Sequence, residues 1–203
     1  MPDAAARANP LLVATRNAHK VGEIRAILGD RFLVGDLGSL PAMPDVRETG
    51  ATFEENAALK AVAASLHFDG WVIADDSGLE VDVLGGAPGV HSARYAGEPS
   101  NDAANNALLL RNLERFHGGE RSARFRCVIV LARNGRNVAA FSGVVEGTIL
   151  DSPRGEGGFG YDPLFVPAGF QESFAQLGSR IKNGLSHRAR ALQALEKSFK
   201  KLA

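Results

Sequence analysis

The sequence predicts an α/β protein with a mixed central sheet flanked by helices, because strand-like and helix-like segments alternate before a hairpin signal. Short apolar runs at residues 11–14 and 71–74 are each typical of a buried strand. Between them, residues 53–66 follow a capping box that starts at Thr52 and have an alanine-rich face, which favours a helix. Strands that alternate with helices are typical of a sheet covered by helices.

The hairpin signal lies in the second half of the chain. Residues 124–133 and 137–145 flank Asn134-Gly135, a dipeptide that favours the positive φ angles of a tight hairpin turn. This antiparallel pair, added to strands that helices connect in parallel, makes the predicted sheet mixed. Further elements are expected as helices at residues 21–28 and 101–116, a strand at residues 79–83 and a last helix after Ser186.

Composition and length limit the possible partners. The 203 residues contain 23 Lys and Arg against 23 Asp and Glu, so excess positive charge for a nucleic-acid polymer or an anionic membrane is missing. Cys127 is the single cysteine, and the longest apolar run, residues 127–132, is far shorter than the ~20 residues of a membrane span. We expect a cytoplasmic protein, with residues 11–203 as one domain or one domain with two lobes, and residues 1–10 as a flexible leader.

The first polar segment lies between a predicted strand and a predicted helix. It reads Thr15-Arg16-Asn17-Ala18-His19-Lys20. A helix N-terminus presents unpaired N–H groups to an anion, and Lys20 adds a full positive charge. Because the Walker pattern is missing, an ordinary strand–helix turn with a solvated lysine is the alternative interpretation.

Two carboxylate-bearing segments follow. Glu48 lies just before the helix that carries Asn56 and Lys60, which are four residues apart and share a face. Asp75 and Asp76 come directly after an apolar strand. Since neighbours in an extended chain point to opposite faces, we expect one aspartate to face metal or water and the other to hold Lys20 or Lys60.

Carboxylates at the end of a strand predict a Mg²⁺ site. This ion keeps several waters and takes further ligands from substrate phosphates, and ligands bind at the strand ends of α/β sheets. A polar turn is the alternative, because the Asp-Asp-Ser-Gly sequence of residues 75–78 also favours turns.

The fourth set combines a glycine–aromatic loop with later basic residues, namely residues 157–163, Lys182 and residues 186–188. Glycines allow a backbone to approach a ligand closely, and an aromatic ring such as Phe159 gives a base a surface for stacking. Asp162 can accept a hydrogen bond from a base N–H, while His187 and Arg188 can donate to a carbonyl or phosphate oxygen. The alternative is a loop filled by its own aromatic side chains.

Taken in order, these segments resemble the inosine/xanthosine triphosphate pyrophosphatase family. The matching residues are Thr15, Asn17, Lys20, Glu48-Thr49-Gly50, Thr52-Phe53, Asn56, Ala57, Lys60, Ala74-Asp75-Asp76-Ser77-Gly78-Leu79, Gly86-Ala87-Pro88-Gly89, Ser92-Ala93-Arg94-Tyr95, residues 157–163 and Ser186-His187-Arg188. The match covers about residues 11–195, and the whole set in register is highly specific. Arg16 departs from the pattern, since the family usually has glycine there.

The resemblance implies a homodimer whose chains have two lobes with a substrate cleft between them. It implies Mg²⁺-dependent attack of water on the α-phosphorus of ITP, dITP or XTP, which gives a nucleoside monophosphate and pyrophosphate. Glu48 and Asp76 would hold the metal, and Asp76, Asp75 and Lys60 would be the catalytic residues, with Asp76 accepting the proton of the attacking water.

The same resemblance implies the substrate-binding residues. They are Thr15, Arg16, Asn17, Ala18, His19, Lys20, Ser77, Phe159, Gly160, Tyr161, Asp162, Lys182, His187 and Arg188. Lys60 and Lys182 would add positive charge near the triphosphate. Phe159 would stack on the base, and the edge of the base would be read by Asp162, His187 and Arg188.

Other functions remain as alternatives. A nucleotide sensor would use the same phosphate and base contacts without a general base, and a pyrophosphatase for modified pyrimidines would share the general logic. An aspartyl-phosphate phosphatase would need Asp-x-Asp spacing, which residues 75–77 do not supply.

Overall fold

The computed structural model describes residues 9–40 and 43–202, so residues 1–8 of the expected leader lie outside the described residues. The elements are β1 (Asn9–Val13), α1 (Ala18–Leu28), β2 (Phe32–Asp36), α2 (Phe53–Ser65), β3 (Trp71–Val81), α3 (Asp102–Asn112), β4 (Ser122–Arg133), β5 (Arg136–Ile149), β6 (Phe165–Pro167), α4 (Phe174–Leu185) and α5 (His187–Leu202). Because β1 begins at Asn9, residues 9 and 10 belong to a strand. The sequence analysis missed β2, β6 and α4.

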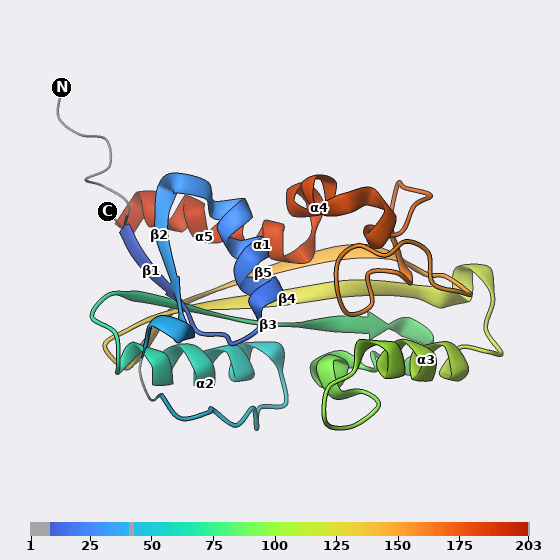
Figure 1. Ribbon diagram of the computed structural model, residues 1–203, viewed down its shortest axis with the longest axis horizontal. Coiled ribbons are helices and arrows are strands. Elements are labelled where there is room, and N and C mark those ends of the chain that lie inside the picture. The colour runs from blue at the N-terminus through green and yellow to red at the C-terminus, as the bar shows by residue number, and fades with distance from the viewer. Residues whose placement is uncertain (1–8, 41–42, 203) are drawn as a thin grey trace. The chain divides into compact units, whose positions relative to one another are not determined.

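The strands form one six-stranded sheet in the order β2-β1-β3-β4-β5-β6 (Figure 1). β1 pairs in parallel with β2 and β3, whereas β5 pairs antiparallel with β6. Asn134 and Gly135, with φ angles of 52° and 72°, connect β4 to β5 as the dipeptide predicts. The α/β class and the mixed sheet are thus confirmed.

The chain divides into two compact units. Unit 1 consists of Met1–Asp76, Val128–Phe141 and Leu192–Ala203, and unit 2 consists of Ser77–Cys127 and Ser142–Ala191. In no helix of the described ranges do length and apolar character suffice for crossing a membrane.

In unit 1, helices α1 and α2 lie on the two sides of strands β1 and β3 (Figure 1). Ala57, Ala61 and Ala64 of α2 are fully buried, and their spacing places them on one helix face. Fully buried residues of β1 and β3 in this unit include Leu11, Leu12, Val13, Val72, Ile73 and Ala74. Burial on both faces explains why these strands read as unbroken apolar runs.

Unit 2 has a core rich in aromatic rings. The ring of Phe125 lies 4.7 Å from that of Phe165, which lies 5.3 Å from that of Phe174, measured between centroids. Such ring pairs add packing energy of about 0.5–1.5 kcal/mol beyond the area they bury. They form a rigid base for the residues at the start of α5.

The prediction of a strand end at Ala74 is wrong. β3 continues without a break from Trp71 to Val81, so Asp75 and Asp76 lie inside the strand and are both buried. Residues 75–78 favour a turn by local preference, but in β3 both carboxylates form ion pairs with lysines that are distant in the sequence. Tertiary contacts therefore decide the local structure.

Candidate active site

Helix α1 begins after Asn17, whose side chain caps it. Asn17 Oδ1 accepts hydrogen bonds from the backbone N–H groups of His19 at 2.9 Å and Lys20 at 3.1 Å. Thr15 Oγ1 accepts one from Asn17 N at 3.2 Å. The prediction of unpaired N–H groups is wrong for His19 and Lys20, because the cap side chain satisfies them. The cap fixes the backbone of this segment, because the Asn17 amide oxygen occupies the acceptor position in front of the His19 and Lys20 N–H groups.

Arg16 is turned toward a different segment of unit 1. Its Nη2 donates to the backbone oxygen of Met43 at 2.9 Å, and its Nε lies 2.9 Å from Asp45 Oδ1. The side chains of Arg16 and Asp45 are 63% and 85% exposed, so water screens this ion pair. Ala18 and His19 are also exposed, in the first turn of α1.

The two aspartates of β3 hold different lysines. Lys20 Nζ lies 2.5 Å from Asp75 Oδ1, and Lys60 Nζ lies 2.8 Å from Asp76 Oδ1. Strand alternation sends the two neighbouring side chains to opposite faces, so each meets a different helix. The expectation that one aspartate holds Lys20 or Lys60 is confirmed, but the other aspartate also holds a lysine, and the expectation that one of them faces metal or water stays a prediction.

Lys60 connects the second aspartate to the segment before α2. Its ammonium lies 2.7 Å from Glu48 Oε1 and donates to the backbone oxygen of Asp75 at 3.0 Å. Burial by itself would lower the pKa of Lys60, but the charges of Asp76 and Glu48 outweigh it and raise that pKa. Lys60 is therefore a permanent cation here. We call Lys20, Glu48, Lys60, Asp75 and Asp76 the carboxylate–lysine group.

The carboxylate–lysine group can accept a further cation. Two ammonium groups face three carboxylates, and Asp76 Oδ2 is buried with no hydrogen-bond partner among the described residues. Burial raises the pKa of Asp76, although Lys60 and Lys20 act against it. In residues 9–40 and 43–202, no three His, Cys, Asp or Glu side chains gather as a metal site. The Glu48 and Asp76 carboxylates are hard oxygen ligands, the type that Mg²⁺ takes together with water and phosphate.

Asn56 fixes the segment that carries Glu48. Its Oδ1 accepts from Gly50 N at 2.8 Å and its Nδ2 donates to Gly50 O at 3.3 Å, while the side chain is fully buried. Such a two-way amide contact replaces the water that the buried backbone would otherwise need. Asn56 and Lys60 share a helix face as predicted, but only Lys60 faces the carboxylates.

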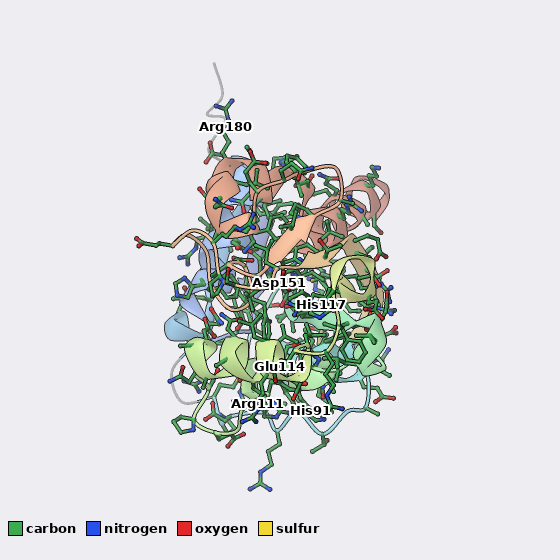
Figure 2. The ribbon with its side chains drawn as sticks, turned by 90° about the vertical axis from the view of Figure 1, so that its right-hand side faces the viewer. His91, Arg111, Glu114, His117, Asp151 and Arg180 are labelled. Atoms are coloured by element: carbon green, nitrogen blue, oxygen red, sulfur yellow. The ribbon has the colours of Figure 1, made fainter. Side chains whose placement is uncertain are left out.

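In unit 2, Asp162 organises the glycine–aromatic loop. Asp162 Oδ2 accepts from Phe159 N at 2.9 Å and from Lys182 Nζ at 2.5 Å. The Lys182 ammonium also lies 4.6 Å from the centroid of the Phe159 ring, within cation–π distance. Lys182 is almost fully buried, whereas Arg180 on the same helix points away from the protein (Figure 2).

Arg188 and His187 stand at the first residues of α5, as predicted. Arg188 is buried, donates from Nη2 to Ser77 Oγ at 3.0 Å, and has its guanidinium carbon 5.9 Å from the Phe159 ring centroid. The His187 ring stacks on Phe125 at 4.9 Å with a 12° angle between planes. We call Phe159, Asp162, Lys182, His187 and Arg188 the aromatic–basic group.

The rest of the loop is held by residues that the sequence analysis missed. Gly160 N donates to Asp102 Oδ2 at 2.7 Å, and Asn106 Nδ2 donates to Gly160 O at 3.0 Å. Tyr161 is buried, and its hydroxyl donates to Ser92 O at 2.9 Å. Burial raises the pKa of Tyr161, so its hydroxyl stays protonated. The only sequence signal for Asp102 and Asn106 was the predicted start of their helix.

The predicted site residues therefore fall into two sets. Those in unit 1 are Thr15, Arg16, Asn17, Ala18, His19, Lys20, Glu48, Lys60, Asp75 and Asp76. Those in unit 2 are Ser77, Phe159, Gly160, Tyr161, Asp162, Lys182, His187 and Arg188. The contacts of Lys182 link it with the aromatic–basic group, and its expected effect on a triphosphate stays a prediction.

Comparison with known proteins gives the family. The sequence profile of the Ham1 family matches residues 11–198. This chain belongs to the Ham1 family. It is 50% identical over 193 residues to a protein named dITP/XTP pyrophosphatase from Geobacillus kaustophilus, covering 95% of each chain. A protein of the same name from Geobacter sulfurreducens is 52% identical over 187 residues, which are 92% of this chain and 94% of that protein.

Solved Ham1 structures have the same fold as this Ham1-family chain. The Ham1 protein of Staphylococcus aureus is 41% identical with a TM-score of 0.84, covering 96% of this chain and 100% of that one. The HAM1 protein of Coxiella burnetii is 38% identical with a TM-score of 0.85, covering 95% and 99%. The resemblance found in the sequence is thus confirmed.

Proposed function

We propose that this Ham1-family protein hydrolyses deaminated purine nucleoside triphosphates, namely ITP, dITP and XTP, to the monophosphate and pyrophosphate. The relatives named dITP/XTP pyrophosphatase support the reaction and the substrate class. The observation that carries the proposal is the pairing of Asp75 with Lys20 and of Asp76 with Lys60, which leaves Asp76 Oδ2 with no hydrogen-bond partner among the described atoms.

The phosphate end of the substrate belongs with the carboxylate–lysine group in this proposal. Glu48 and Asp76 would hold Mg²⁺, whose chemistry would be to neutralise phosphate charge and to make a bound water more acidic. Lys20 and Lys60 would compensate the negative charge of the triphosphate, and Thr15 and Asn17 would orient it through hydrogen bonds.

The reaction needs one proton acceptor and one in-line attack. Water oxygen forms a bond to the α-phosphorus while the bond from that phosphorus to the bridging oxygen breaks, and pyrophosphate leaves with the bond's electron pair. Asp76 accepts the water proton through a carboxylate oxygen. Asp75 keeps Lys20 in place through its ion pair, so its role is support.

The base end belongs with the aromatic–basic group. Phe159 supplies a ring for stacking, and Arg188 and His187 supply donors for a 6-oxo group. Adenine presents an amino group there, so donor would meet donor. A polar group left unpaired in this way costs about 1–3 kcal/mol, or about 5- to 150-fold per contact. Asp162 as an acceptor for the base remains part of the proposal, beside its contacts with Phe159 and Lys182.

The assembly and location complete the proposal. We infer a homodimer and a cytoplasmic enzyme, because the resemblance implies the first and a free nucleotide pool is the expected substrate source for the second. We propose neither a nucleic-acid polymer nor a membrane as a partner, because a chain with a net charge of zero has no overall positive field to attract either one. Light scattering of the purified protein tests the dimer.

The experiment that tests the function is a turnover panel. ITP, XTP, GTP and ATP are each incubated with the protein, with Mg²⁺ or with a chelator, and pyrophosphate and orthophosphate are measured separately. We expect pyrophosphate from ITP and XTP with Mg²⁺, at rates well above those for ATP. Binding of ITP without any product would favour the sensor alternative, and orthophosphate as the main product would contradict the proposed bond cleavage.

A further inference from the structure

Two side chains on one face of α3 hold the backbone of Gly160, one at its N–H and the other at its C=O. Asp102 accepts from Gly160 N at 2.7 Å, and Asn106 donates to Gly160 O at 3.0 Å. The two side chains are four residues apart, so they lie on the same helix face. The N–H of Gly160 belongs to the peptide group before its Cα and the C=O to the one after it, so the two side chains hold the backbone on both sides of this residue, and we call the pair the α3 clamp.

The clamped residue, Gly160, is next in the chain to Phe159, whose ring is proposed to stack on the base. Gly160 follows Phe159 directly and has a φ angle of +62°, a conformation that glycine adopts without strain. Glycine-rich backbone is flexible unless other groups hold it. Here the N–H of Phe159 donates to Asp162. On the other side of Gly160, the hydroxyl of Tyr161 donates to the backbone oxygen of Ser92.

The clamp is not explained by packing of α3 alone. Asp102 is exposed, and Asn106 is half-buried with an Oδ1 atom that is buried and has no hydrogen-bond partner within the described part of the chain. A residue selected only for helix packing would not bury an unsatisfied amide oxygen, which costs free energy. The contacts of both side chains instead converge on Gly160.

We infer that Asp102 and Asn106 are positioning residues for base selection. They act through the backbone of Gly160 on the Phe159 ring. This inference rests on the proposed function, because it assigns the base end of the same substrate to that ring. Neither residue needs to touch the nucleotide. Loosening the clamp should let the ring tilt and should weaken binding of a base, whereas binding of phosphates alone should not change.

The test separates the base end from the phosphate end with two probes. Binding of inosine monophosphate and of inorganic tripolyphosphate is measured by calorimetry for the wild-type protein, Asp102→Ala, Asn106→Ala and the double variant. We expect each single variant to bind inosine monophosphate about 3- to 10-fold more weakly and tripolyphosphate within 2-fold of wild type. Because both side chains hold the backbone of the same residue, the double variant should lose less inosine monophosphate affinity than the product of the two single losses.

Three controls keep the result specific. Asp102→Asn keeps an acceptor for Gly160 N and should restore most of the binding. Arg111→Ala changes an exposed residue near the end of the same helix (Figure 2) and should change nothing. Thermal unfolding of every variant shows whether the fold is intact, and if Asp102→Ala unfolds, Asp102→Asn against Asn106→Ala gives the comparison.

Turnover then links the clamp to selectivity. In the clamp variants, the ratio of kcat/KM for ITP to that for ATP should fall about 3- to 10-fold, with the tripolyphosphate affinity unchanged. Equal weakening of both probes, or an unchanged ratio together with unchanged inosine monophosphate binding, would overturn the inference. If the wild type binds inosine monophosphate but hydrolyses no triphosphate, the proposed function fails while the binding comparison still decides the clamp.

Discussion

The carboxylate–lysine group of unit 1 and the aromatic–basic group of unit 2 are built on different physics. In unit 1, ion pairs join Lys20 of α1 to Asp75 of β3, and Lys60 of α2 to Asp76 of β3 and to Glu48. In unit 2, one buried ion pair lies against aromatic rings, and backbone groups fix a loop. In the proposed function, the first group would recognise charge, and the second would recognise shape and hydrogen-bond direction.

This difference has a consequence for substrates. Phosphates are the same in every nucleoside triphosphate, so a change in unit 1 should alter all substrates by the same factor. Bases differ, so a change in unit 2 should alter the ratio between them. The predictions below separate the two groups, starting with the largest effect.

The largest loss is expected for Asp76→Asn. The amide cannot accept the water proton and is a poorer ligand for a divalent cation, so kcat should fall by about 10³-fold or more for every substrate. Steady-state kinetics with ITP and XTP measure it, with circular dichroism to confirm the fold. Glu54→Gln, an exposed change on α2, is the matched control. Activity within 10-fold of wild type would remove Asp76 as the base.

Lys20→Met should weaken all triphosphates alike. The change removes a charge while it keeps an apolar stem, so kcat/KM should fall about 10- to 100-fold for ITP and ATP by the same factor. Some stability should also be lost, because Asp75 loses this ion pair. Kinetics at substrate concentrations below KM give the ratio. A selective loss for one base would place Lys20 at the wrong end of the substrate.

Arg188→Ala should change the choice of base. Removing the donor takes away an interaction with a 6-oxo group, so the preference for ITP over ATP should fall about 10-fold. The ratio of kcat/KM values measures this effect, and it is independent of the fraction of folded protein. Thermal unfolding is expected to show lower stability, because Arg188 is buried. Loss by one common factor for both nucleotides would contradict the assignment to the base.

The smallest effect is expected for Arg16→Gly. The ion pair with Asp45 is exposed on both sides, and exposed pairs contribute about 0–1 kcal/mol. Any contact of residue 16 through its backbone survives the change. Activity should stay within about 3-fold of wild type and the melting temperature within a few degrees. A 10-fold loss for all triphosphates would instead show that the Arg16 side chain binds phosphate.

Every residue of the two groups could be named from the sequence, but how the residues are held could not. The capping box at Thr52, the face shared by Asn56 and Lys60, and the hairpin at Asn134-Gly135 are local patterns, and local patterns can be read from one sequence. Asp75 and Asp76 were expected at the end of a strand, because they come directly after the apolar run of residues 71–74. Their burial inside β3 depends on Lys20 and Lys60, which are distant in the sequence.

The missed elements have a similar cause. β2 and β6 are short, and the residues of β2 do not alternate clearly between buried and exposed. In α4, Gly178 interrupts the helical backbone with a φ angle of 75°, which weakens the sequence signal for a helix. Asp102 and Asn106 bind the backbone of Gly160, and a side chain that recognises backbone leaves no pattern in its target's sequence.

The most direct test of the proposed reaction follows the oxygen of water. ITP is hydrolysed in water enriched in ¹⁸O, and the products are analysed by mass spectrometry. Attack on the α-phosphorus, with Asp76 as the proton acceptor, predicts one ¹⁸O atom in the phosphate of inosine monophosphate and none in pyrophosphate. Label in pyrophosphate, or inosine diphosphate as the product, would contradict it.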